Sequence, residues 1–268
     1  MNMNLYLREF NRNKKELLIW ISIISTLLIM VMAFYPSISK DTQMYEQMIE
    51  TLPKPVIAMF SLNDLSMGDL FGYYALQGFL IVGLMGSIYV MILSSGILSK
   101  EEGDKTIEFL LSKPISRREV ITSKLLCYLT NIIILNIVIS IVIFISFKLV
   151  SEESFSMKTF ILISLAPLFI QLIFSAIGFL ISVFITKSKK ITPFSMIVVF
   201  LAYFLGVMSD INNNIEFLKY LSPFEYFKPG DIVLNNQIDV NSIIVLVSVN
   251  IFCIALTYFI YQKKDITI

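Results

Sequence analysis

The sequence predicts an all-α membrane protein that crosses the bilayer six times. Apolar side chains make up 56% of the 268 residues and charged side chains only 15%, whereas a soluble domain usually carries about 25% charged residues. Six runs of at least 19 residues contain no charged residue at all. Roughly 20 helical residues cross a hydrocarbon core of about 30 Å, so each run is long enough to span the membrane. A soluble helical core would show polar stripes within such runs, and these runs show almost none.

The charged residues between these runs predict how the chain is oriented. Alternating the loops from an inner N-terminus puts 15 of the 21 Lys and Arg residues on the inner side and 12 of the 20 Asp and Glu residues on the outer side. By the positive-inside rule, we expect a multi-pass protein of the cell membrane with both termini in the cytoplasm. Residues 1–268 form one six-span domain, with spans expected at 17–38, 71–98, 125–147, 159–185, 192–209 and 241–261.

Residues 1–16 combine apolar and basic side chains in a pattern that fits a short amphipathic helix. One interpretation is that the basic residues only flank the first span. The other is an N-terminal elbow helix that lies in the inner membrane interface. The residues concerned are Leu5, Leu7, Phe10, Arg8, Arg12, Lys14 and Lys15.

Small and polar residues inside the spans predict how the helices meet. Gly83 and Ser87 are four residues apart and share one helix face, where small side chains let two helices approach closely in lipid. They indicate either packing within the chain or a dimer seam. Isolated polar residues are expected to form interhelical hydrogen bonds, with the lining of a transport path as the alternative: Gln77, Asn131, Asn136, Gln171 and Asn250.

The inner segment 99–124 is the longest polar stretch on that side. Residues 106–111 favour a helix, which the Lys113–Pro114 pair must interrupt. Ser116 and Glu119 then fit a capping box that starts a second helix. The result is a helix, a sharp turn and a helix facing the cytoplasm, and its mixed charge suits docking of a soluble partner. We expect this protrusion to expose to solvent Glu101, Glu102, Glu108, Arg117 and Arg118.

The outer segment 210–239 mixes aromatic and acidic residues, a composition that favours the membrane interface. A short helix is expected at 215–221, with Pro223 ending it. We interpret the segment as a re-entrant or cap element whose central residues are Tyr220, Pro223, Phe224 and Tyr226.

Two of these segments resemble the ABC-2-type permease family. From Glu101 to Glu119 the chain reads EEGDKTIEFLLSKPISRRE, which is similar to the family's acidic Gly-Thr helix followed by Leu-Leu-Ser-x-Pro-Ile-Ser-Arg. It departs from that pattern at Asp104–Lys105, which separate the Gly from the Thr. The later YLSPFEY, residues 220–226, resembles the family's outer Ser-Pro-Phe-x-Tyr element, and the six-span layout covers the whole chain.

The resemblance implies the membrane subunit of an ATP-binding-cassette exporter, with the ABCG-like (type V exporter) transmembrane fold. It implies an ABC ATPase subunit as partner, which would bind ATP and magnesium, and a second permease chain, with a homodimer favoured over a heterodimer. It also implies that the 99–124 segment couples ATP hydrolysis to the spans, through the residues Glu101, Glu102, Glu108, Phe109, Leu110, Pro114, Ile115, Ser116, Arg117 and Arg118.

Missing residue types argue against other functions. The chain has no histidine, which excludes Ser-His catalysis and His-ligated metals. Gly103–Thr106 is not a P-loop, because Asp104 separates the Gly from the Lys and places an acid where phosphate would bind. The six runs contain no Asp or Glu for a proton relay. We therefore expect no enzyme activity, cofactor, metal or nucleic-acid partner in this chain.

The composition of the spans bears on the cargo. Their many Phe, Met, Ile and Leu residues would line a path with apolar side chains. Such a lining suits a hydrophobic or amphipathic cargo, for example an antimicrobial or toxin-like peptide, that is moved out of the cell. The spans themselves are expected to contact membrane lipids. The alternative is a membrane scaffold or accessory protein without transport activity.

Overall fold

The structure is a computed structural model that describes residues 2–42, 51, 65–103, 115–151, 154–185, 188–211 and 213–264. Within these ranges all regular secondary structure is helical. The elements, in chain order, are α1 (Met3–Ile38), α4 (Leu70–Tyr73), η1 (Tyr74–Gly78), α5 (Phe79–Gly103), α7 (Arg117–Val150), α8 (Met157–Ile181), η2 (Ser188–Lys190), α9 (Ile191–Ile211), η3 (Asn213–Leu221), η4 (Glu225–Phe227), α10 (Pro229–Asn235) and α11 (Val240–Lys263).

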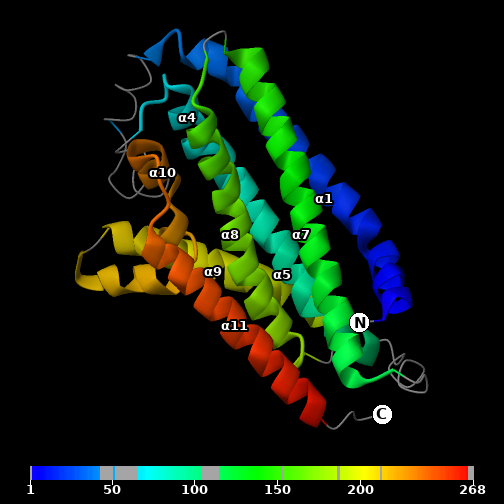
Figure 1. The fold of residues 1–268 in the computed structure, drawn as a ribbon. Helices are drawn as coiled ribbons and strands as arrows, with labels where there is room; N and C mark the ends of the chain where they lie inside the picture. Colours follow the sequence, from blue (N-terminus) through cyan, green and yellow to red (C-terminus); the bar gives the residue numbers. More distant parts are fainter. Residues whose placement is uncertain are drawn as a thin grey trace.

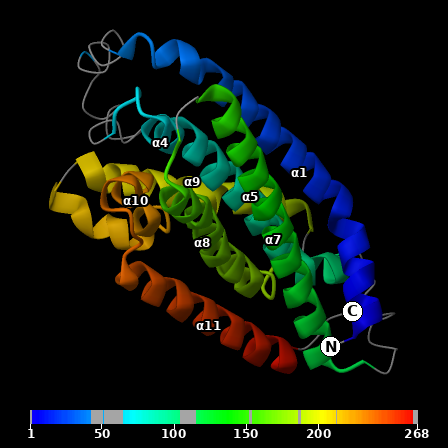
Figure 2. The same cartoon turned by 45° about the horizontal axis from the view of Figure 1, so that its top comes forward.

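Six long apolar helices confirm the predicted spans. They are α1, the continuous stretch Leu70–Glu101 that contains α4, η1 and most of α5, and then α7, α8, α9 and α11. Both chain termini lie at the same end of the bundle (Figures 1 and 2), as an even number of spans requires. We call this the terminal end and the opposite one the distal end.

Helices α5 and α8 form the centre of the bundle. Helix α1 packs along α7, α11 packs along α8, and α9 crosses α5 (Figure 1). Two glycines let α5 and α8 approach closely. A Cβ on Gly178 would lie 2.2 Å from Ser94 Oγ, and one on Gly86 would lie 2.2 Å from Gln171 Nε2. A larger side chain at either position would require Ser94 or Gln171 to move.

The outward faces of the helices are apolar. Four isoleucines spaced four residues apart form a stripe along α7, and each is at least 50% exposed: Ile133, Ile137, Ile141 and Ile145. Similar residues cover the outward faces of α1, α9 and α11. Since lipid tails solvate such side chains, these faces suit the hydrocarbon core of a bilayer.

Helix α1 runs without interruption from Met3 to Ile38, so residues 3–16 continue directly into the first span. The junction at Lys14–Leu17 holds good helix formers and neither Gly nor Pro, and nothing there ends the helix. The amphipathic pattern has another cause. Glu9 and Asn13 face the interior with Leu5 and Leu17, and the basic residues face outward.

The distal part of the second span contains one π-helical turn, η1, between α4 and α5. On one side of this turn, Phe71 and Tyr74 pack edge-on against Phe147 of α7, with ring centroids 5.6 and 5.4 Å away. On the other side, Phe79 faces α9. The π turn therefore separates two stretches of one span that face different neighbours.

Candidate functional site

A cluster of buried charges joins three helices at the terminal end. The Nζ atom of Lys124, in α7, lies 3.2 Å from Glu101 Oε1 near the end of α5 and 3.6 Å from Glu9 Oε1 in α1. It also donates a hydrogen bond to the carbonyl of Ile97. The side chains of all three charged residues are at most 2% exposed. We call them the Lys124 cluster. Because buried charges are costly unless they are paired, the cluster fixes α1, α5 and α7 relative to one another.

Further polar contacts surround Glu9 on α1. Arg12 pairs with its other oxygen, Oε2, at 2.8 Å. Asn13 donates to the Glu9 carbonyl at 3.0 Å and lies 3.9 Å from the Cys127 sulfur. Cys127 and Cys253 are both buried free thiols, which pack as small apolar side chains. The start of α1 is thus held against α7 by charge and by hydrogen bonds.

The start of α7 is bound to the end of α11. Ser116 and Glu119 form the predicted capping box, with the Glu119 backbone N–H donating to Ser116 Oγ at 3.2 Å and the Ser116 N–H donating to Glu119 Oε2 at 3.0 Å. Arg117 donates from one nitrogen, Nη1, to the backbone carbonyls of Tyr261, Gln262 and Lys264, at 3.2, 3.1 and 2.7 Å. A guanidinium suits this position because the last carbonyls of a helix lack intrahelical donors.

The predicted coupling residues are therefore in different settings. Glu101 is buried in the Lys124 cluster, so the expectation that it projects into solvent is wrong: Lys124, on the far side of the segment, provides a partner inside the protein. Ile115 is half-buried beside Leu5 and Val120. Arg118 is exposed and donates to Gln262 Oε1 at 3.4 Å. Glu102 lies in α5, but its side chain is not among the described ones. The remaining predicted coupling residues lie outside the described ranges: Glu108, Phe109, Leu110 and Pro114.

Polar residues within the spans do form interhelical hydrogen bonds. Asn136 of α7 donates to Gln171 Oε1 of α8 at 2.7 Å, and Tyr89 of α5 donates to Asn131 Oδ1 of α7 at 3.5 Å. Asn250 donates only to a carbonyl of its own helix, among the bonds that the structure describes. The central helices are thus joined by amides as well as by apolar packing.

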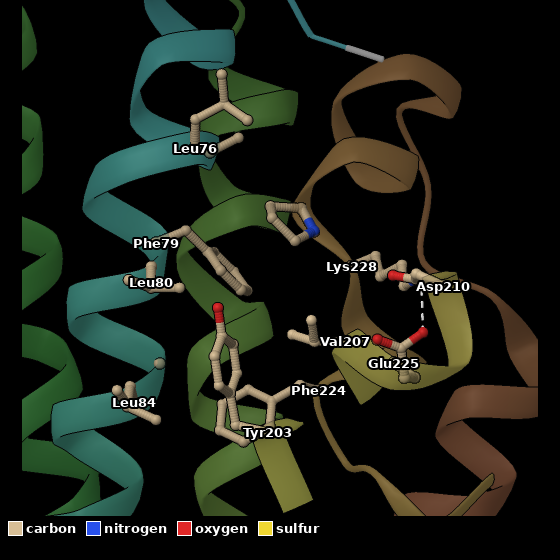
Figure 3. Close-up of a pocket in the computed structure, with 13 residues that line it drawn as sticks. Leu76, Phe79, Leu80, Leu84, Tyr203, Val207, Asp210, Phe224, Glu225 and Lys228 are labelled. Carbon is tan, nitrogen blue, oxygen red and sulfur yellow. Dashed lines mark hydrogen bonds and ion pairs between the residues drawn. The ribbon is translucent and has the colours of Figure 1, made fainter. Parts of the chain in front are cut away.

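A pocket of about 70 Å³ opens at the distal end between α5, α9 and the segment that follows α9. In Figure 3, Phe79 and Tyr203 point toward each other across it, and the charged side chains gather on the other side. Most of the lining is apolar. Its complete set is Ala75, Leu76, Phe79, Leu80, Gly83, Leu84, Tyr203, Val207, Asp210, Phe224, Glu225, Lys228 and Pro229.

Lys228 lies between two carboxylates at the edge of this pocket. Its Nζ is 2.7 and 2.8 Å from the two oxygens of Asp210, and 2.6 Å from Glu225 Oε2. We call these residues the Lys228 cluster. Burial raises the pKa of Glu225 above its usual range, although the bond to Lys228 opposes this shift. Burial alone would lower the pKa of Lys228, but its bonds to Asp210 and Glu225 outweigh that effect and raise it.

Helix α9 and the residues after it meet closely beside this cluster. A Cβ on Gly206 would lie 2.8 Å from Glu225 Oε1 and 2.9 Å from Ser222 Oγ. Ser222 is fully buried, and its hydroxyl has no hydrogen-bond partner among the described residues. The absence of a side chain at Gly206 is therefore what lets the Glu225 carboxylate lie against α9.

Of the predicted cap residues, only Phe224 is in the lining of the pocket. The centroid of its ring lies 5.6 Å from that of Tyr203. Pro223 is buried, Tyr220 is 65% exposed, and Tyr226 donates from its hydroxyl to the Tyr220 carbonyl at 3.0 Å. The helix expected at 215–221 is the 3-10 element η3, kinked at Ile215.

Gly83 and Ser87 lie inside the single chain rather than on an open surface. Both are buried, and a Cβ on Gly83 would lie 3.8 Å from the rings of Phe79 and Phe224. This placement corresponds to packing within the chain. Among the described residues, no group of three or more His, Cys, Asp or Glu side chains is placed to hold a metal ion.

Sequence reasoning missed the two residues at the heart of the terminal end, Glu9 and Lys124. Both were counted as loop charges that set topology. The signal for Glu9 was its spacing, four residues from Leu5 and from Asn13 on the buried face of α1. Lys124 likewise shares a helix face with Val120 and Cys127, which are both buried. The pocket residues Tyr203 and Gly206 carry no comparable signal, because only the folded chain brings them to Phe224 and Glu225.

A family model described as "ABC-2 family transporter protein" matches residues 3–266, nearly the whole chain. A search of curated proteins finds no match.

Proposed function

We propose, because this chain belongs to the ABC-2 transporter family, that it is the permease subunit of an ABC exporter whose ATP is hydrolysed by a separate ATPase chain. Members of this family are membrane subunits that are not themselves catalytic. The observation that carries the proposal is the fixation of both flanks of residues 104–114. Glu101 precedes this segment and is bound in the Lys124 cluster, while Arg117 follows it and is bound to the end of α11.

This fixation supports a coupling role for the 99–124 segment. A displacement of the segment would act on α5 through Glu101, on α7 through Ser116 and Arg117, and on α1 through Glu9. Close-packed interiors have low compressibility, so the spans would move with the segment rather than absorb its displacement. The ATPase, with its bound ATP and magnesium, would dock at this end of the bundle.

The orientation follows from the basic residues. We infer that the terminal end faces the cytoplasm, since its helices and connections carry most of the Lys and Arg residues. The distal end, with the pocket and η3, then faces outward. The start of α1 would extend beyond the hydrocarbon core, because its 36 residues measure about 54 Å at 1.5 Å per residue. An elbow-like role for these turns and the ABCG-like type of the domain are part of this proposal.

Cargo and assembly are proposed from chemistry alone. The apolar, uncharged spans suit a hydrophobic or amphipathic cargo, such as a small antimicrobial or toxin-like peptide. One six-span chain would supply half of a transport pathway, so we propose two permease chains, as a homodimer, with two ATPase chains.

The test is capture of a candidate ABC ATPase by this chain, followed by measurement of cargo-stimulated ATP hydrolysis. Interface energy concentrates in a few buried apolar anchors, so Phe109→Ala and Leu110→Ala should each weaken capture by about tenfold or more, and the matched Lys113→Ala by much less. Reversing the charge of Glu101 is unsuitable here, because it would disrupt the Lys124 cluster itself. Equal capture by all three variants would remove the segment from the interface. Capture without stimulated hydrolysis for any cargo would favour the scaffold alternative.

A further inference from the structure

The distal pocket combines an apolar wall with a local excess of negative charge. Its charged lining residues are two carboxylates, Asp210 and Glu225, and one ammonium, Lys228. Lys228 contacts both oxygens of Asp210 but only one oxygen of Glu225. A third acid, Asp231, is near enough to act on Glu225 through its charge. Within the lining the balance is one uncompensated negative charge, at a place where the side chain of Glu225 is only 12% exposed.

The second oxygen of Glu225, Oε1, does not contact Lys228 and lies close to the backbone of Gly206. Oε1 points at the bare backbone of Gly206, beside the buried Ser222 hydroxyl, which has no partner among the described residues. A hydroxyl without a partner in a buried site leaves an acceptor available to a donor that enters it. Both oxygens lie close to the Cα of Gly206, but of these three residues only Glu225 lines the pocket, so its carboxylate is the group that meets a ligand there.

Aromatic rings complete the surroundings. Phe79, Tyr203 and Phe224 line the pocket, and the rings of Tyr203 and Phe224 meet at 85° with centroids 5.6 Å apart (Figure 3). The faces of such rings attract cations, and more strongly where water is excluded. Carboxylates and aromatic faces together select positive charge, and the leucines of α5 select an apolar body.

We propose that the distal pocket binds the cationic head of an amphipathic ligand, an ammonium group carried on an apolar chain. The ammonium contacts Glu225 and the aromatic rings, and the apolar chain extends along α5 and α9 into the surrounding lipid. A pocket of about 70 Å³ holds such a head group or a few water molecules, but it is too small for a whole lipid or peptide. The inference deepens the proposed transport function by naming a ligand class, but the binding itself requires neither ATP nor a partner.

The experiment uses octylammonium as the probe and octanol as its uncharged match. The full chain is placed in nanodiscs of zwitterionic lipid, binding is measured by isothermal titration calorimetry, and the signal of empty nanodiscs is subtracted as partitioning. Octylammonium is expected to bind the wild-type chain saturably at one site. Octanol is expected to show partitioning only.

Three variants locate the site. Glu225→Gln keeps the shape and removes the charge, so it should weaken octylammonium binding at least about tenfold, the effect of losing one charge-assisted contact. The matched Glu216→Gln, in the same outer segment but outside the pocket lining, should stay within about twofold, since exposed charges contribute little. Gly206→Ala should weaken binding without removing any charge, because its methyl group displaces the Glu225 carboxylate. A thermal unfolding curve for each variant confirms that it is folded.

Equal binding of octanol and octylammonium would overturn the proposal, as would unchanged binding by Glu225→Gln or an equal loss in Glu216→Gln. ATPase capture depends on the terminal end and is measured separately. If octylammonium does not bind but the ATPase is captured, the ligand proposal fails and the proposed function is unaffected. If octylammonium binds as expected but the ATPase is not captured, the proposed function fails and the ligand site is unaffected.

Discussion

The two ends of the bundle carry the same set of charges in different surroundings. Each has one lysine between two carboxylates: Lys124 with Glu9 and Glu101 at the terminal end, and Lys228 with Asp210 and Glu225 at the distal end. The Lys124 side chain is 0% exposed, and the Lys228 side chain is 28% exposed. Burial makes the first cluster a fixed joint between helices. The second cluster is partly exposed beside a pocket, which gives a ligand access to its charged groups.

The largest expected difference between the ends is in the cost of removing the lysine. Lys124→Met removes the buried cation from Glu101 and leaves Glu9 with Arg12 alone, so it should destabilise the protein by about 3–5 kcal/mol. Lys228→Met, the matched change in the part-exposed cluster, should cost at most about 1 kcal/mol. The free energy of unfolding is measured by titration with dodecyl sulfate in mixed micelles, followed by circular dichroism. Equal losses at both ends would refute the contrast between them.

A double variant sharpens the assignment within the terminal end. Adding Glu101→Gln to Lys124→Met removes one of the stranded charges, so the double variant should be more stable than Lys124→Met alone by about 1–3 kcal/mol. The same unfolding titration measures it. If the second substitution adds its own loss instead, then Glu101 and Lys124 are not energetically coupled.

Arg117 provides the next test of how firmly the terminal end is held. Arg117→Ala removes a charged donor from the last carbonyls of α11 and should cost about 1.5–3 kcal/mol. Hydrogen exchange in the last turn of α11 should also become faster. Arg118→Ala is the control, since that exposed side chain makes one long bond, and it should change stability by less than about 0.5 kcal/mol. Similar exchange in both variants would contradict the anchoring role of Arg117.

The smallest expected effect is in the middle of the bundle, between the two charged ends. Asn136→Ala breaks the bond from α7 to Gln171 of α8 and should cost about 0.6 kcal/mol, the average for interhelical hydrogen bonds in membranes. Asn250→Ala, which removes a bond within a single helix, should cost less. A loss at Asn136 as large as that at Lys124 would mean that the uncharged middle, and not the terminal joint, fixes the helices.

The helices could be predicted because each depends on residues close in sequence. The charge-free runs, the Ser116–Glu119 capping box and the end of a short helix before Pro223 are all local patterns, and the structure contains each of them. The amphipathic pattern of residues 3–16 predicted a helix but not its neighbour, since such a pattern does not say which element covers its apolar face. For residues 3–16 that neighbour is α7.

The contacts of the site depend on residues far apart in the chain, and this is why the sequence did not reveal them. Glu101 was expected in solvent because the helix–turn–helix pattern indicates a protrusion, but its partner Lys124 follows only after the whole inner segment. The pocket needs α5, α9 and η4 together, and the local pattern near Phe224 indicates only an interfacial aromatic segment. Gly206 is a clear case, since its role appears only once Glu225 lies against it.

The π-helical turn at Tyr74–Gly78 has a consequence for insertions and deletions in this chain. A π turn holds one residue more than the α-helical turn it replaces, and one residue corresponds to a rotation of roughly 100° about the helix axis. Deleting a single codon within 74–78 would restore a regular helix and turn Phe71 away from Phe147, or Phe79 away from the pocket. The number of residues between these two phenylalanines is therefore constrained in this span, independently of which residues they are.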